Sequence, residues 1–241
     1  MRNVWLIAKR ELGVYLRTPA GYLITAGLLL LDGLAFNVFG VGSSPKLSSA
    51  VLQDYLYFAF GLTSVAAILI SMRLIAEERQ TGTLTLLFTS PVKEHEIILA
   101  KFGSALVFVT VMNLLTIYIP LLIFVNGKVS IGHIAAGYLG LTLQAATVLA
   151  IGVFGSAISW NQLMAGVVTA LIVALLVLLW MVARVTEPPL NKIISYLALF
   201  QGHFQSFQRG ILRVSDLIFY ASIIFFALLA STRVLQSQRW R

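Results

Sequence analysis

Few residues of this 241-residue chain have a type and spacing that could do chemistry. It has no cysteine and three histidines, and residues 94–96 (EHE) lack the HExxH spacing that puts two zinc ligands on one helical face. Residues 90–93 (SPVK) match the bare SxxK pattern of serine acylases, but no supporting triad accompanies them. Residues 40–46 lack the second glycine of a phosphate-binding loop. We therefore predict no catalytic residue, no metal site, no bound cofactor and no ATP binding by that route.

The composition places the chain in a membrane. It is 59% hydrophobic and 11% charged, with a mean hydropathy of +0.92. Soluble domains carry about 25% charged residues, so lipid must cover the missing polar surface. The 17 Lys and Arg against 9 Asp and Glu indicate retained cytoplasmic loops more than a nucleic-acid partner. We predict a single all-α polytopic membrane domain over residues 1–241, with the lipid bilayer as a partner and no nucleic acid.

Six apolar runs approach the ~20 residues that a helix needs to cross a bilayer. They are approximately Gly21 to Phe39, Tyr55 to Ile75, Ile98 to Val125, Ile134 to Ile158, Leu163 to Ala183 and Leu217 to Leu235. With both termini inside, the inner side holds eleven of the seventeen basic residues: Arg2, Lys9, Arg10, Arg17, Arg73, Arg79, Lys93, Lys101, Arg233, Arg239 and Arg241. This bias predicts that both termini are cytoplasmic.

Residues 1–18 form a helical pattern of their own. Basic side chains gather on one face, and the opposite face is apolar: Val4, Trp5, Ala8, Leu12, Tyr15 and Leu16. Pro19 disfavours helical geometry at Thr18, which predicts a corner before the first span. We therefore expect an interfacial helix; an unstructured basic tail is the alternative.

The loop of residues 77–96 carries an apolar helical face. Leu84, Leu87 and Phe88 recur at i, i+3 and i+4, so a short helix there would expose a hydrophobic stripe that a partner must cover. Gly82 fits a break, and Thr83 fits the N-cap of that helix. A solvated loop that packs on its own helices is the alternative.

The segment of residues 186–215 is too apolar for a plain linker on the outer side. We expect it to dip into the outer leaflet or to lie on it. It could gate an exit path or dock an extracytoplasmic accessory protein, and simple packing against the span ends explains it equally well. Phe204, Phe207, Arg209 and Asp216 are the candidate residues of this outer surface.

Polar residues within the spans are sparse. Asp32 is the one carboxylate inside an apolar run, so we expect it to face protein or water and to be protonated or functional. Asn113 and Gln144 are candidate pathway residues, although interhelical hydrogen bonds explain them more simply. The many small residues of positions 135–159 predict close helix packing.

Five features in order resemble the membrane subunit of ABC-2 type exporters. They are the surface helix, six spans, Glu77-Glu78-Arg79 followed by Gly82-Thr83-Leu84, the Ser90-Pro91-Val92 turn, and Lys101 at the start of span three. The resemblance covers nearly the whole chain and implies the ABC-2 permease fold, which is type V exporter-like. The run of residues 204–211, with Asp216, Tyr220 and residues 238–240, looks like the branch of the gliding-motility and copper-enzyme maturation permeases, GldF and NosY.

The resemblance implies a function without catalysis in this chain. In such permeases the loop between spans two and three carries a coupling helix, here with Glu77, Glu78, Arg79, Gly82 and Thr83, that docks on a separate ABC ATPase subunit. That subunit would bind ATP and Mg²⁺, and a second permease copy or close paralogue would complete the pathway. The expected function is export of a substrate driven by ATP hydrolysis. The alternative is a mechanotransmitter that moves an extracytoplasmic partner and carries no substrate.

Overall fold

The computed structural model describes residues 2–40, 47–84, 92–127 and 129–239, and every element within those ranges is a helix. Six segments are long and apolar enough to cross a membrane: Pro19–Val38, Ser48–Gln80, Glu94–Val125, Ile131–Ile158, Gln162–Val185 and Val214–Gln238. The predicted all-α fold with six spans is confirmed. The second segment begins at Ser48 instead of Tyr55, because hydrogen bonding continues the helix beyond the purely apolar run.

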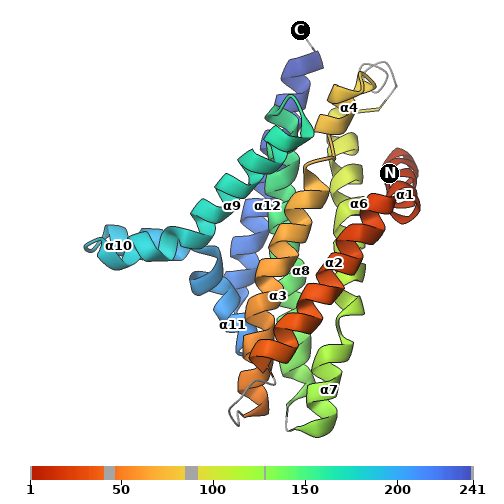
Figure 1. The fold of residues 1–241 in the computed structure, drawn as a ribbon. Helices are drawn as coiled ribbons and strands as arrows, with labels where there is room; N and C mark the ends of the chain where they lie inside the picture. Colours follow the sequence, from red (N-terminus) through yellow and green to blue (C-terminus); the bar gives the residue numbers. More distant parts are fainter. Residues whose placement is uncertain (1, 41–46, 85–91, 128, 240–241) are drawn as a thin grey trace.

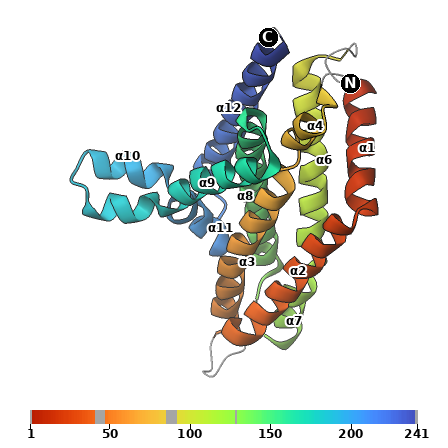
Figure 2. The same ribbon diagram turned by 45° about the horizontal axis from the view of Figure 1, so that its top comes forward.

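The elements follow one another as an up-and-down bundle (Figure 1). The first half contains α1 (Arg2–Arg17), α2 (Pro19–Ala35), the π-helical turn η1 (Phe36–Gly40), α3 (Ser48–Ser71), α4 (Ala76–Gln80), α6 (Glu94–Leu115) and α7 (Tyr118–Asn126). The second half contains α8 (Ile131–Ile158), α9 (Gln162–Val185), α10 (Leu190–Leu197), η2 (Leu199–Phe204), α11 (Gln205–Gln208) and α12 (Val214–Arg239). The start of α1, the end of α12 and α4 gather at one end of the bundle (Figure 2).

Helix α8 is the centre of the bundle and contacts α3, α6, α9 and α12. Its glycines allow this close packing. A Cβ atom added to Gly152 would lie 1.9 Å from Ser71 Oγ, and one added to Gly140 would lie 2.6 Å from Phe207 Cβ. The expectation of close packing around these small residues is confirmed.

Helix α1 meets α2 at the predicted corner, where Thr18 is extended and Pro19 is the first residue of α2. One face of α1 packs on α6, with the Tyr15 and Phe108 rings stacked at 5.1 Å between centroids. The predicted apolar face is only partly covered, because Trp5 and Leu16 stay 66% and 56% exposed. These two side chains lie at the edges of the face that contacts α6.

Residues 186–215 divide into an exposed part and a part that packs on the bundle. Helix α10 lies beside the end of α9, and the two project sideways from the bundle (Figures 1 and 2). Its apolar side chains are exposed: Leu190, Ile193, Tyr196 and Leu197. The chain then returns, and η2 and α11 pack against α8. The Gln208 side chain donates a hydrogen bond of 2.7 Å to the Gln53 carbonyl oxygen, which ties α11 to the first turns of α3.

Candidate functional site

The loop after α4 is the region to which the sequence assigned a function, and the structure describes its two ends. Glu77, Glu78, Arg79, Gly82, Thr83 and Leu84 are described, whereas Leu87 and Phe88 lie outside the described residues. The site is therefore built from α4, the turn after it, and the helices that contact them.

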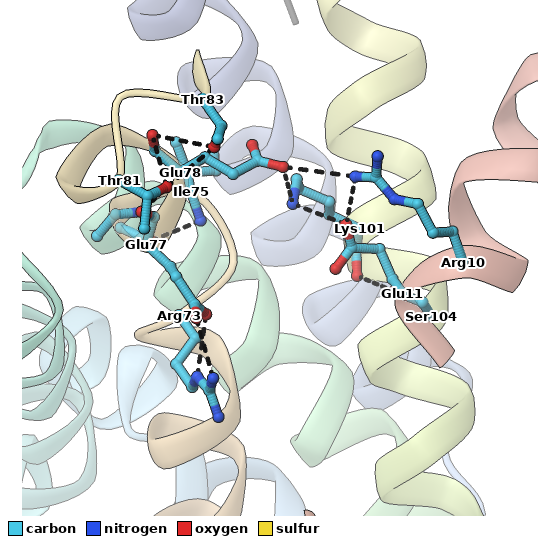
Figure 3. A network of polar contacts seen from close by, with 12 residues as sticks. Arg10, Glu11, Arg73, Ile75, Glu77, Glu78, Thr81, Thr83, Lys101 and Ser104 are labelled. Carbon is cyan, nitrogen blue, oxygen red and sulfur yellow. Dashed lines mark hydrogen bonds and ion pairs between the residues drawn. The ribbon is translucent and has the colours of Figure 1, made fainter. Parts of the chain in front are cut away.

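Lys101 of α6 lies at the centre of a charged cluster formed by Arg10, Glu11, Glu78 and Lys101, which we call the Lys101 cluster (Figure 3). Its ammonium group, only 2% exposed, lies 2.9 Å from Glu78 Oε1 and 3.2 Å from Glu11 Oε1. Arg10 Nη2 approaches the same two carboxylates, at 3.1 Å from Glu11 and 3.7 Å from Glu78. Two cations face two anions, so the burial of the lysine is compensated by opposite charge. The cluster joins α1, α4 and α6.

Arg79 connects α4 to the ends of two other helices. Its guanidinium donates hydrogen bonds to the Ser159 carbonyl oxygen at 2.6 Å, to the Ala157 carbonyl oxygen at 2.8 Å, and to Oε1 of Gln238. The Ala157 and Ser159 carbonyls are at the C-terminus of α8, where no intrahelical donor remains for them. Gln238 belongs to α12, so Arg79 holds α4, α8 and α12 together.

Glu77 points away from the Lys101 cluster. Its carboxylate accepts two hydrogen bonds of 3.0 Å from Arg73, one turn earlier. Gly82 has φ of +72°, the left-handed conformation that glycine adopts without strain, so the predicted break is confirmed. Thr83 donates to the Glu78 carbonyl oxygen at 3.4 Å. Its predicted capping role concerns amides of the following helix, which lie outside the described residues.

Leu84 differs from its prediction. It was expected on an uncovered face, but it is 9% exposed and belongs to the same apolar cluster as Ile75, Ile97 and Ile98. The turn at Gly82 brings the chain back onto its own helices, so this leucine anchors the start of the loop. Any docking face must therefore come from the residues after it.

The intramembrane polar residues join helices to one another. Asn113 Oδ1 accepts a hydrogen bond of 3.0 Å from Thr63, and Gln144 donates one of 2.5 Å to Ser64, so α3 is bonded to both α6 and α8. Asp32 is 2% exposed, and its Oδ1 has no hydrogen-bond partner within the described residues. Asp32 therefore does face protein, as expected.

A hydroxyl cluster in the same half of the bundle was missed by the sequence reasoning. The Tyr55 hydroxyl donates to Thr116 at 2.8 Å, and the Tyr138 hydroxyl lies 2.9 Å from Thr116 and 3.2 Å from Tyr55. Three hydroxyl groups within apolar runs were the available signal. Their convergence from three helices was not visible in the sequence.

Three of the four candidate residues of the outer surface are buried, which agrees with the alternative that this segment packs against the ends of the spans. Phe204 and Phe207 are 0% exposed and pack against α8. Asp216 Oδ1 lies 2.8 Å from His203 Nδ1, and both side chains are 3% exposed. Of the four candidates, only Arg209 is exposed. These aromatic side chains are buried because the backbone returns to the bundle after α10.

An apolar groove of about 720 Å³ opens between α3, α9 and η2. We call it the α3–α9 groove. Aromatic rings of all three elements line it, among them Tyr57, Phe60, Trp180 and Phe200, and Ser64 and Gln201 add polar groups. It is large enough for an amphiphilic molecule or for side chains of another subunit.

Glu11 of the Lys101 cluster also affects Tyr15 on α1. Burial, together with the negative charge of Glu11, raises the pKa of the Tyr15 phenol above its ordinary value, so this group stays neutral at physiological pH. No group of three or more His, Asp or Glu side chains converges in the part of the chain that the structure describes.

The model of the ABC-2 family transporter proteins matches residues 5–239, which is nearly the whole chain. The chain belongs to the ABC-2 transporter family. No curated protein matches it. ABC-2 proteins are membrane subunits that are generally not themselves catalytic, and membership generally implies an ABC ATPase partner. In this ABC-2 protein, the paired Glu78 and Lys101 lie on either side of the loop between the second and third spans.

Proposed function

We propose that this chain is the permease subunit of an ABC exporter, in which a separate ATPase subunit binds ATP and Mg²⁺ and drives a substrate across the bacterial cytoplasmic membrane. The observation that carries the proposal is that Glu78 and Arg79, adjacent in α4, contact four other helices. A force applied to the loop would therefore reach α1, α6, α8 and α12 through ion pairs and hydrogen bonds.

The docking surface of this proposal lies after Leu84. Leu84 is anchored in the core, and Leu87 and Phe88 remain the apolar residues for an ATPase contact. Glu77 with its partner Arg73 is only partly buried, as suits the polar rim of such a contact. Burial of a phenylalanine side chain stabilises an interface by about 1.5 to 3 kcal/mol, more than a rim charge does.

Substitution of Phe88 tests the proposal. We expect Phe88→Asp to weaken co-purification of the partner ATPase by at least roughly tenfold, because the apolar contact is replaced by a charge. Phe88→Leu is the matched control and should retain most of the binding. Unchanged binding in both Phe88→Asp and Leu87→Asp, with normal membrane insertion, would show that this loop is not the coupling element.

A second permease copy, identical or closely related, is part of the proposal. The exposed apolar faces of α3 and α9 beside the α3–α9 groove support it, because one six-span subunit offers only half of an enclosed pathway. We expect two permease and two ATPase subunits in native mass spectrometry. A complex with one copy of each would contradict this part.

The proposed orientation has both termini and the loop of residues 77–96 in the cytoplasm. It rests on the eleven-to-six charge bias and on the gathering of α4, the start of α1 and the end of α12 at one end of the bundle (Figure 2). Lys192→Cys on α10 should react with a membrane-impermeant thiol reagent in intact cells, and Ser237→Cys at the end of α12 should not. The reverse result would invert the orientation.

The second candidate function is mechanotransmission to an extracytoplasmic accessory protein. The sideways projection of α10, with exposed Ile193 and Leu197, favours it, as does the resemblance of the C-terminal region to the GldF and NosY branch. Transport by the complete complex in sealed vesicles separates the two. ATP-dependent uptake of substrate supports the exporter, whereas ATP turnover that requires the outer partner and moves no solute supports the mechanotransmitter.

A further inference from the structure

The outward face of α1 carries a shallow groove of about 520 Å³, which we call the α1 groove. Its lining residues recur at helical spacing on the side opposite to the contact with α6: Leu6, Lys9, Arg10, Gly13, Val14 and Arg17, with Thr18 at the end. The groove is thus a property of one helical face and is separate from the loop after α4.

The charge of the α1 groove is positive. Lys9 and Arg17 are exposed and have no ion-pair partner within the described ranges of the chain. Arg10 alone has acidic partners, and both of them, Glu11 and Glu78, are also paired with the buried Lys101. Three cations on one face therefore present an excess of positive charge to a ligand.

Gly13 lies between these cations and leaves the floor of the groove open. A Cβ atom built there would meet no atom within 4 Å, so packing within the chain does not require a glycine at this position. Glycine disfavours a helix interior. Leu6 and Val14 stay 58% and 43% exposed along the same groove, and Trp5 is exposed beside it. The face thus combines cations with apolar walls, which suits an anion that carries an apolar chain.

We propose that the α1 groove binds an anionic phospholipid of the leaflet in which α1 lies. Lys9, Arg10 and Arg17 would contact the phosphate, and the acyl chain would lie against Leu6 and Val14. Since Arg10 Nη2 is also 3.7 Å from Glu78 Oε1, the lipid competes with α4 for this arginine. The proposal rests on the proposed function only in assigning that leaflet to the cytoplasmic side.

Fluorescence quenching of Trp5 in vesicles tests the proposal. In a variant with Trp160→Phe, Trp180→Phe and Trp240→Phe, Trp5 is the remaining tryptophan. We expect brominated phosphatidylglycerol, added to phosphatidylcholine vesicles, to quench Trp5 at a much lower fraction than brominated phosphatidylcholine does. Lys9→Gln with Arg17→Gln should raise the phosphatidylglycerol fraction needed for half-quenching by roughly tenfold, because each charge near the surface contributes to anionic-lipid affinity.

Two further variants sharpen the result. Gly13→Leu places a side chain on the floor of the groove, where its Cβ atom meets no atom within 4 Å, and should also remove the phosphatidylglycerol preference, although it changes no charge. The matched control is Arg184→Gln with Lys192→Gln, which removes two cations from α9 and α10 and should leave the preference intact.

Three outcomes would overturn the proposal. The first is a phosphatidylglycerol preference that survives the loss of Lys9 and Arg17. The second is a control variant of Arg184 and Lys192 that loses the preference as fully as the Lys9 and Arg17 variant does. The third is soluble glycerol 3-phosphate that relieves the quenching of Trp5 as well as unlabelled phosphatidylglycerol does. The last result would identify a free phosphate as the ligand instead of a lipid. No ATPase is present in this experiment, so its failure does not bear on the permease role.

Discussion

The two ends of the bundle are held together by different chemistry. At the α4 end, helices meet through charged and amide groups, with Lys101, Glu78 and Arg79 at the centre. At the α11 end they meet through aromatic rings, and one buried pair, His203 with Asp216, lies among them. Close-packed rings resist small displacements, whereas ion pairs can exchange partners when helices shift. From this comparison we predict that the helices at the α4 end shift more readily than those at the α11 end.

Truncation of Phe207 should have the largest effect. The ring is 0% exposed and lies against Gly140 of α8, so Phe207→Ala should destabilise the protein by about 3 to 5 kcal/mol through lost contacts and a cavity. Unfolding in mixed micelles measures this loss. Phe226→Ala, at a ring that is 66% exposed on α12, is the matched control and should cost far less. Equal losses would remove the packing argument for the α11 end.

Neutralisation of Lys101 should have the second largest effect on stability. Lys101→Met leaves Glu11 and Glu78 with Arg10 alone, so we expect a loss of about 2 to 4 kcal/mol and weaker coupling of ATP turnover to transport. Adding Glu78→Gln should recover part of the stability, because it removes one of the uncompensated charges. The same unfolding assay and the ATPase rate of the complex are the measurements. A fully additive double variant would show that Lys101 and Glu78 do not interact.

Removal of the buried acid at the α11 end should have a moderate effect. His203 Nε2 lies 2.8 Å from the Tyr196 carbonyl oxygen, which can only accept, so Nε2 carries a proton while Nδ1 faces Asp216. Asp216→Asn weakens the second contact and should destabilise this end by about 1 to 3 kcal/mol. Protease sensitivity of residues 198–210 reports the effect locally. Arg209→Ala, at an exposed neighbour, should leave the cleavage rate unchanged, and equal cleavage of both variants would contradict the assignment.

The smallest effect is expected at Glu77. Its pair with Arg73 is partly exposed and lies within one helical turn, so Glu77→Gln should cost only about 0.3 to 0.5 kcal/mol. The adjacent Glu78→Gln should cost more, because its carboxylate pairs with the buried Lys101. If Glu77→Gln lowered the free energy of unfolding more than Glu78→Gln, Glu77 would be the residue that stabilises the fold.

Prediction from sequence succeeded for features that depend on a single residue or a single stretch of the chain. Six spans followed from continuous apolar runs, the break at Gly82 followed from a residue free to adopt positive φ, and Asn113 and Gln144 bond to neighbouring helices as polar groups in lipid must. The sequence left open whether Leu84 and Phe204 face a partner or pack on the protein's own helices, and the structure shows both buried. An apolar side chain outside a span can face a partner or the protein's own core, and its type does not distinguish the two.

The sequence by itself determined that this chain has six segments apolar and long enough to cross a membrane and that it belongs with the ABC-2 proteins, because hydropathy and short motifs act along the chain. Only the tertiary structure decided that Lys101 pairs with Glu11 and Glu78, and that Arg79 binds the ends of α8 and α12. Lys101 and Glu11 are 90 residues apart. Charges at such separations meet only where the packing of apolar helices brings their ends together, and that packing depends on the shape of every buried side chain between them.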